Sequence, residues 1–228
     1  MNTMNTMNDI TNDTTKKIKE VVGLIDRSGS MTGKEADTIG GINTMLSELK
    51  ENVSKNKDLD VRVSIKYFNH KEDLILKSVP LDSIDLLDVK TYIPDGNTAL
   101  KDTLGKTLKH FMFKHLLNPD AYHSCIIYVA TDGLDNSSYY YSKSNIKEMI
   151  EKAKKHHNIE VIYLGANQDA IGEATSLGIS ATQAINYSED KESTFSVYRA
   201  VARMASSGEK NFTPDLGFTP TERQNSAR

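Results

Sequence analysis

The sequence predicts an α/β fold: a doubly wound, mostly parallel six-stranded sheet with one antiparallel edge strand and helices on both faces. Short apolar runs alternate along the chain with segments of helical periodicity, which is typical of sheets built from strand–helix–strand units. Residues 124–131 form a continuous apolar run, as in a strand buried on both faces of a parallel sheet. Residues 61–67 and 74–79 flank a tight polar turn, which predicts an antiparallel hairpin.

The predicted strands are short and rich in β-branched residues. The first, Val21-Val-Gly-Leu-Ile25, is too short for a helix. In the second, every other residue is apolar, so one face of that strand is expected to be wetter than the other. In chain order, the predicted strands are 21–25, 61–67, 74–79, 124–131, 159–164 and 184–187.

Helices are predicted where apolar residues recur every three or four positions. The segment 37–53 shows this spacing at Ile39, Ile42, Leu46 and Leu49. In chain order, the predicted helices are 37–53, 99–115, 143–155, 169–177 and 194–205.

Low-complexity ends frame one predicted domain in this chain of 228 residues. Residues 1–18, which repeat Met-Asn-Thr, are expected to form a flexible tail, and residues 19–206 the domain. Residues 207–228 form a C-terminal tail in which Phe212 and Phe218 each open a Phe-Thr-Pro sequence. This repeat is a candidate docking segment for a partner, although such a tail can also lie along its own domain or stay loose.

The composition is that of an ordinary soluble protein, with 38% hydrophobic and 26% charged residues. The formal net charge of −3 argues against nucleic acid or an anionic membrane as the main partner. Because the single cysteine cannot form an intrachain disulfide and no apolar stretch resembles a signal peptide or a membrane span, a cytoplasmic location is expected.

Polar residues with oxygen donors follow two predicted strands and precede one helix. Asp26, Ser28 and Ser30 follow the first strand, Thr98 precedes the helix at 99–115, and Asp132 follows the strand at 124–131. Ligands of doubly wound sheets bind beyond the carboxyl ends of the strands, where these segments should meet. Hard oxygen ligands without histidine or cysteine suit Mg²⁺, Mn²⁺ or Ca²⁺. Taken singly, the same residues could be helix caps or turn residues.

This arrangement resembles the metal-ion-dependent adhesion site of von Willebrand factor type A domains, whose three loops supply Asp-x-Ser-x-Ser, then Thr, then Asp. The resemblance covers roughly residues 19–205. It implies that Ser28, Ser30 and Thr98 bind the metal directly, whereas Asp26 and Asp132 act through water or accept hydrogen bonds from the hydroxyls. Phrases such as Asp-Arg-Ser-Gly-Ser-Met and Leu-Gly-Ala-Asn-Gln-Asp-Ala are similar to a compact intracellular subgroup of bacteria, phages and large viruses, which implies host cytoplasm or a virion.

The function that follows is a non-catalytic protein-binding module. A metal held largely by neutral hydroxyls stays electrophilic, so it can accept a carboxylate from an acidic residue of a protein partner. Tyr139, Tyr140 and Tyr141 follow the third loop and could contact that partner, or they could pack against the edge of the sheet. The sequence gives no indication of the oligomeric state.

Two other functions are weighed against this one. The chain could be a structural subunit of a virion or another assembly, with a metal that serves stability only. It could also be a magnesium-dependent phosphohydrolase of the haloacid dehalogenase type. That chemistry needs a second Asp two residues after the first, where this chain has Ser28, and a lysine partner is not evident. The chain is therefore expected not to be an enzyme.

Overall fold

The computed structural model describes residues 17–54, 59–166, 169–206 and 216–227. Phe212 and most of the predicted N-terminal tail lie outside these residues. In the described part, six strands form one sheet in the order β3-β2-β1-β4-β5-β6. All neighbouring strands are parallel except β2 and β3, which form an antiparallel hairpin at one edge. The predicted fold class is confirmed.

The strands agree in number and order with the predicted ones, and several are longer. They are β1 (Lys17–Asp26), β2 (Leu59–Phe68), β3 (Glu72–Pro80), β4 (Tyr122–Thr131), β5 (Ile159–Ala166) and β6 (Ala184–Tyr187). The first strand starts four residues before its apolar run because Lys19 and Glu20 are buried within the sheet. Hydrophobicity alone does not identify such buried charged positions. Burial lowers the pKa of Lys19 to about 8.

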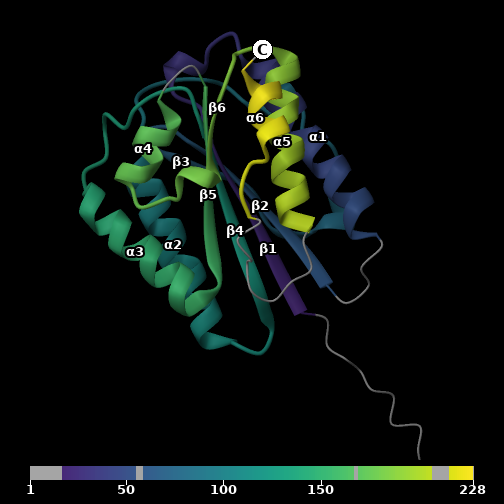
Figure 1. Ribbon diagram of the computed structural model, residues 1–228, viewed down its shortest axis with the longest axis vertical. Helices are drawn as coiled ribbons and strands as arrows, with labels where there is room; N and C mark the ends of the chain where they lie inside the picture. Colours follow the sequence, from purple (N-terminus) through teal and green to yellow (C-terminus); the bar gives the residue numbers. More distant parts are fainter. Residues whose placement is uncertain (1–16, 55–58, 167–168, 207–215, 228) are drawn as a thin grey trace, which may run out of the picture.

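Helices cover both faces of the sheet (Figure 1). On one face lie α1 (Glu35–Val53), α5 (Lys191–Ser206) and α6 (Pro220–Ser226); on the other lie α2 (Leu100–Leu117), α3 (Lys143–His157) and α4 (Ala170–Ser176). A hydrophobic core fills the space between each helical layer and the sheet. Gly41 of α1 allows close packing on α5, since a Cβ atom there would lie 2.4 Å from the Tyr198 ring. None of the described helices is long and apolar enough to cross a membrane.

Helix α6 places the described end of the C-terminal tail against the chain's own domain. Thr219 and Glu222 form a reciprocal capping box, and Pro220 occupies the first turn. The guanidinium of Arg203 in α5 donates to both carboxylate oxygens of Glu222, at 2.7 and 3.0 Å. Phe218 is 7% exposed and belongs to the core under α5, so its ring is not presented to a partner.

Candidate metal centre

The two acidic residues predicted to form the site lie at the ends of adjacent parallel strands. Asp26 is the last residue of β1, and Asp132 directly follows β4. Because Ile25 pairs with Ala130, both strands end at the same level. The loops after β1 and β4 therefore meet at the carboxyl edge of the sheet, as the fold predicts.

A run of hydrogen bonds joins four of the five predicted residues. The Ser28 backbone N–H donates to Asp26 Oδ1 at 2.7 Å, and the hydroxyls of Ser28 and Ser30 lie 3.1 Å apart. The Ser30 hydroxyl then donates to Asp132 Oδ1 at 2.6 Å. The run crosses from the first loop to the third. None of Asp26, Ser28 and Ser30 caps α1, whose N-cap position is Lys34. Ser28 is the N-cap of the short helical turn Gly29–Met31, but its side chain makes no capping bond there, so capping does not account for these residues.

Thr98 is tied to the same place through the backbone of its loop. The Asn136 N–H donates to the Thr98 carbonyl at 3.0 Å, and the Thr98 N–H donates to Asn136 Oδ1 at 2.9 Å. The Gly29 N–H donates to the carbonyl of Gly96 at 2.9 Å, which joins the first loop to the second. Gly96 has a φ of +73°, and a Cβ atom there would lie 2.3 Å from the His70 ring, so only glycine fits. Thr98 is 3% exposed and does not cap α2, whose N-cap position is Ala99.

The Asp26 carboxylate is completely buried and held from two sides. Besides the bond from Ser28, its Oδ2 accepts a 2.5 Å hydrogen bond from the hydroxyl of Thr131. Burial raises the pKa of Asp26 above its ordinary value of 3.8, the hydrogen bonds from Thr131 and Ser28 oppose this, and the nearby charge of Asp132 raises it further. Two carboxylates thus lie close together in a poorly hydrated place, where a cation between them would be favourable.

Sequence reasoning missed two charged residues at this edge. The ammonium of Lys34 contacts both Asp132 Oδ2 and the carboxylate of Glu189. Burial lowers the pKa of Lys34, but the contacts with the two carboxylates outweigh burial and raise it. Three carboxylates and one ammonium leave a local excess of two negative charges, which a divalent cation would balance. Glu189 is 155 residues from Lys34 in the sequence, so no local motif indicates the contact.

The donor chemistry of the site fits a hard cation. In the described part of the chain, no group of three or more His, Cys, Asp or Glu residues is arranged to hold a metal. The predicted site instead combines hydroxyls with two carboxylates, a set that suits Mg²⁺, Mn²⁺ or Ca²⁺ better than softer metals. Ser28, Ser30 and Thr98 would supply neutral oxygens, and Asp26 and Asp132 the charge.

The tyrosines after the third loop divide into two groups. Tyr139 and Tyr140 are 88% and 73% exposed. Tyr141 instead packs on Gly105 of α2, where a Cβ atom would lie 2.8 Å from its ring. The backbone N–H groups of all three donate to the carboxylate of Asp102, at 2.9–3.0 Å. The first two therefore remain available to a partner, whereas the third has a packing role.

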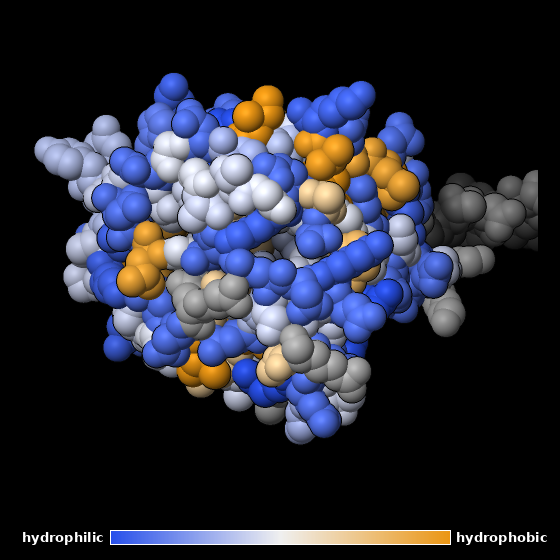
Figure 2. All heavy atoms as spheres, turned by 90° about the horizontal axis from the view of Figure 1, so that it is seen from above, coloured by the Kyte–Doolittle hydropathy of each residue, from blue (hydrophilic) through white to orange (hydrophobic). Residues whose placement is uncertain are grey.

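The surface around the carboxyl edge of the sheet carries both hydrophobic and hydrophilic residues. β1 runs upward in Figure 1, so the site lies on the side that Figure 2 views from above. Figure 2 shows hydrophobic residues in several separate groups among hydrophilic ones. Leu134, two positions after Asp132, is 61% exposed. A partner at this edge would meet small apolar contacts around a polar centre.

Comparisons with known proteins agree with the fold. The family model for the von Willebrand factor type A domain matches residues 20–207. Proximal thread matrix protein 1 from the mussel byssus is 14% identical with a TM-score of 0.55, over 84% of this chain and 47% of that chain. The pilus adhesin SpaC from Lactobacillus rhamnosus GG, in its open conformation, is 12% identical with a TM-score of 0.63, over 83% and 30%.

A von Willebrand factor type A protein from Catenulispora acidiphila is 15% identical with a TM-score of 0.56, over 84% of this chain and 43% of that chain. This chain thus spans less than half the length of these three structures, and at such identities the likeness shows the fold alone. Another structure of the mussel protein, with a TM-score of 0.52, is described as having a zinc-occupied MIDAS motif. No curated protein matched the sequence. Because the family model spans most of the chain, the chain belongs to the von Willebrand factor type A domain family.

Proposed function

We propose that the chain is a non-catalytic protein-binding domain that depends on a divalent metal. Mg²⁺, or Mn²⁺ or Ca²⁺ in its place, is held by Asp26, Ser28, Ser30, Thr98 and Asp132 and accepts a carboxylate from an acidic residue of a protein partner. The observation that carries the proposal is the hydrogen-bonded run from Asp26 through the two serines to Asp132, which joins two loops far apart in the sequence.

The charges at the site favour an acidic partner. The two aspartates balance a divalent cation, and the neutral hydroxyls leave it electrophilic. Lys34 and Glu189 contact each other and together add no charge. A carboxylate from a partner would then complete the coordination of a site that carries no excess negative charge. The exposed rings of Tyr139 and Tyr140 supply contact area beside it.

Two further observations support a metal site that is not catalytic. A solved structure of the same fold is described with a metal in its MIDAS motif, which supports metal binding by these loops here. Ser28 occupies the position where a phosphohydrolase of the type weighed above needs its acid–base aspartate. Its side chain instead lies in the run of hydroxyls that would hold the metal.

The metal is tested by calorimetric titration of Mg²⁺ and Mn²⁺ into the wild-type protein and two variants, Ser30→Ala and Thr98→Ala. Each variant removes one neutral donor and no charge. Thr32→Ala is the matched control, since its hydroxyl lies in the same loop but donates to the Gly29 carbonyl at 2.8 Å. We expect each donor variant to weaken binding at least tenfold, about 1.4 kcal/mol, and the control to stay near wild type. Unchanged binding in both donor variants would overturn the metal site.

The partner chemistry is tested by selecting binders from a random-peptide library in Mg²⁺, eluting them with denaturant, and then measuring their binding with and without chelator. Selected peptides should contain Asp or Glu, and replacement by Asn or Gln should abolish binding. Ser30→Ala should lose the same peptides. If chelation lowers the melting temperature but leaves peptide binding intact, the metal is structural and the proposed function is wrong.

A further inference from the structure

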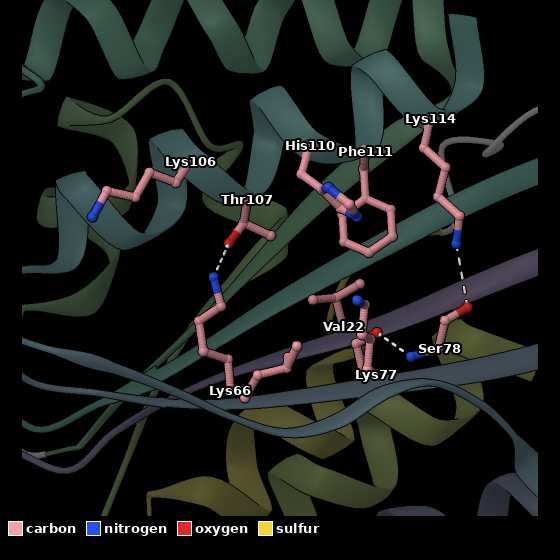
Figure 3. Close-up of a pocket in the computed structure, with 11 residues that line it drawn as sticks. Val22, Lys66, Lys77, Ser78, Lys106, Thr107, His110, Phe111 and Lys114 are labelled. Atoms are coloured by element: carbon pink, nitrogen blue, oxygen red, sulfur yellow. Dashed lines mark hydrogen bonds between the residues drawn. The ribbon is translucent and has the colours of Figure 1, made fainter. Parts of the chain in front are cut away.

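A cavity of about 370 Å³ lies between α2 and the edge of the sheet formed by β1, β2 and β3 (Figure 3). Helix α2 begins next to the metal loops at Leu100 and also forms one wall of the cavity. The first cavity-lining residue of this helix is Lys106, about 9 Å further along the helix axis. The cavity is therefore separate from the metal centre. Its volume falls within the range of small-molecule sites, roughly 300–1,000 Å³.

The inner wall of the cavity is apolar. Val22 of β1 and Phe111 of α2 are buried there, and Leu74 of β3, half exposed, lies at the rim. Figure 3 shows Thr107, His110 and Phe111 pointing from α2 toward the strands. These apolar groups offer a surface for the body of a ligand.

Four lysines surround this apolar wall: Lys66, Lys77, Lys106 and Lys114. The ammonium of Lys114 lies 2.5 Å from the carboxylate of the buried Glu20, which neutralises its charge. Lys66 and Lys106 share one carboxylate, that of Glu72, which lies 2.6 Å from Lys66 and 2.8 Å from Lys106.

Lys77 has no carboxylate within ion-pair distance in the described part of the chain. Lys66, Lys77 and Lys106 with the one carboxylate of Glu72 therefore leave an excess of two positive charges at the cavity. His110 adds no charge at neutral pH, because burial and the neighbouring lysines lower its pKa below 6.5.

The strand that carries Lys77 is distorted at this place. Between the pairs Val63–Val79 and Ile65–Leu76, β3 has one residue more than β2, so the ladder contains a bulge. Ser78, within the bulge, has a φ of +49°, in the left-handed region that residues other than glycine rarely adopt. Such conformations persist where the surroundings hold them.

Three hydrogen bonds hold the bulge, and a fourth joins β2 to α2 across the cavity. Ser78 N–H donates to Ser64 Oγ at 2.9 Å, and Ser78 Oγ donates to Glu20 Oε1 at 2.6 Å. Lys114 donates to Ser78 Oγ at 3.2 Å, and Lys66 donates to Thr107 Oγ1 at 3.3 Å across the cavity. Figure 3 shows these lysine contacts bridging helix and strands on two sides of the space. The wall is thus a fixed structure, as a binding site requires.

We propose that this cavity binds a small amphipathic anion. Its apolar body, aromatic or aliphatic, lies against Val22, Phe111 and Leu74, and its acidic head group, a carboxylate or a phosphate, lies among Lys66, Lys77 and Lys106. The apolar wall contributes affinity that does not depend on orientation, and the excess positive charge of the lysines over Glu72 selects an anionic head group.

The competing explanation is that the lysines only protect the sheet edge. Lysines on an edge strand such as β3 prevent pairing with other chains, and their aliphatic stems can cover apolar surface. This explanation predicts no preference for anionic over neutral apolar molecules.

The proposal is tested with two fluorescent probes titrated into the whole protein in the presence of chelator. The anionic probe is 8-anilinonaphthalene-1-sulfonate, and the neutral one is N-phenyl-1-naphthylamine, which has a similar apolar body without the sulfonate. Two variants alter the site. The double variant Lys77→Gln/Lys106→Gln removes two charges and leaves Glu72 paired with Lys66, and Leu74→Trp fills the rim. Lys152→Gln, at an exposed ion pair on α3, is the control.

We expect the wild-type protein to bind one equivalent of the anionic probe. The double variant and Leu74→Trp should each lower the affinity for this probe roughly tenfold. The control should bind as wild type does, and the neutral probe should bind more weakly. Displacement by 1-naphthoate and by 1-naphthyl phosphate then shows which head group the site prefers. The proposal would be overturned, in favour of edge protection, by any of three results. The anionic probe does not bind, it binds equally to all variants, or it binds no more tightly than the neutral probe.

Discussion

The hydroxyl of Ser30 donates a 2.6 Å hydrogen bond to Oδ1 of Asp132, although 102 positions separate the two residues. The other oxygen of Asp132 accepts from the ammonium of Lys34. One carboxylate thus connects a predicted metal ligand to a positive charge of the chain itself. Because the carboxylate cannot serve the ammonium and a metal equally well, Lys34 should influence how strongly the site binds a cation.

Replacing Lys34 by Met should strengthen Mg²⁺ binding. The variant keeps the aliphatic stem but removes a positive charge that repels the metal and occupies Asp132. We expect an affinity roughly five- to tenfold higher at about 0.1 M salt, with a smaller gain at high salt because screening weakens the repulsion. Calorimetric titration measures the change, with Lys152→Met as the control. An affinity that stays the same or falls would show that Lys34 orients Asp132 for the metal and does not compete with it.

Removing the hydroxyl of Thr131 should destabilise the protein without changing its charge. Thr131→Val is nearly isosteric, but it removes the hydroxyl that donates a 2.5 Å hydrogen bond to the buried carboxylate of Asp26. Leaving a buried charged group short of a partner costs about 1–3 kcal/mol. Urea denaturation in chelator measures the loss, and Thr131→Ser should recover most of it. If the serine variant is as unstable as the valine variant, packing of the methyl group dominates.

Asp102 should be needed for the order of the loop that presents the exposed tyrosines. Its carboxylate accepts three consecutive backbone N–H groups, from Tyr139, Tyr140 and Tyr141. We expect Asp102→Ala to cost about 2–4 kcal/mol in the free energy of unfolding and to increase amide hydrogen exchange at 139–141. Asp37→Ala, which removes a first-turn acid of α1, is the control. Protection at 139–141 that survives in the alanine variant would contradict the anchoring role.

The order of the elements could be predicted, and so could the meeting of the loops that carry the five candidate residues, because each has a local signal. Short apolar runs indicate the strands, and oxygen-bearing residues at the strand ends mark loops that the fold brings to one edge. Helix α6 was not predicted because its sequence, Pro-Thr-Glu-Arg-Gln-Asn-Ser, has no apolar face. Its capping box of Thr219 and Glu222, with Pro220 between them, was a readable signal that a hydrophobic pattern does not use.

Contacts between distant polar residues could not be predicted. Lys34 with Glu189, and Asp102 with the tyrosine loop, pair groups that have ordinary local roles at a helix start. Their long-range partners depend on where the loops end in space. The cavity beside α2 was missed for the same reason, since its lysines come from β2, β3 and α2 and form no motif in the sequence.

Below about pH 6.5, the protein should lose stability through a pair of histidines between α2 and α3. The Nδ1 atoms of His115 and His157 lie 3.2 Å apart, so at least one ring must be neutral to accept a hydrogen bond. Burial lowers the pKa of both below the ordinary 6.5, and for His157 the nearby His115 and His156 lower it further. Since the unfolded chain then binds more protons than the folded one, stability is complete above pH 6.5 and falls as the pH decreases through the folded pKa values.

Urea denaturation in chelator between about pH 5 and 7.5 measures this dependence. The double variant His115→Gln/His157→Gln should have a flatter profile than wild type over that range, because neither replacement titrates. His156→Gln, which removes an exposed neighbour, is the control and should keep most of the wild-type slope. If the double variant retains the full slope, the acid sensitivity arises elsewhere and the pair contributes little. Chelator is needed in every sample because protons also compete with a metal for the aspartates at the opposite end of the sheet.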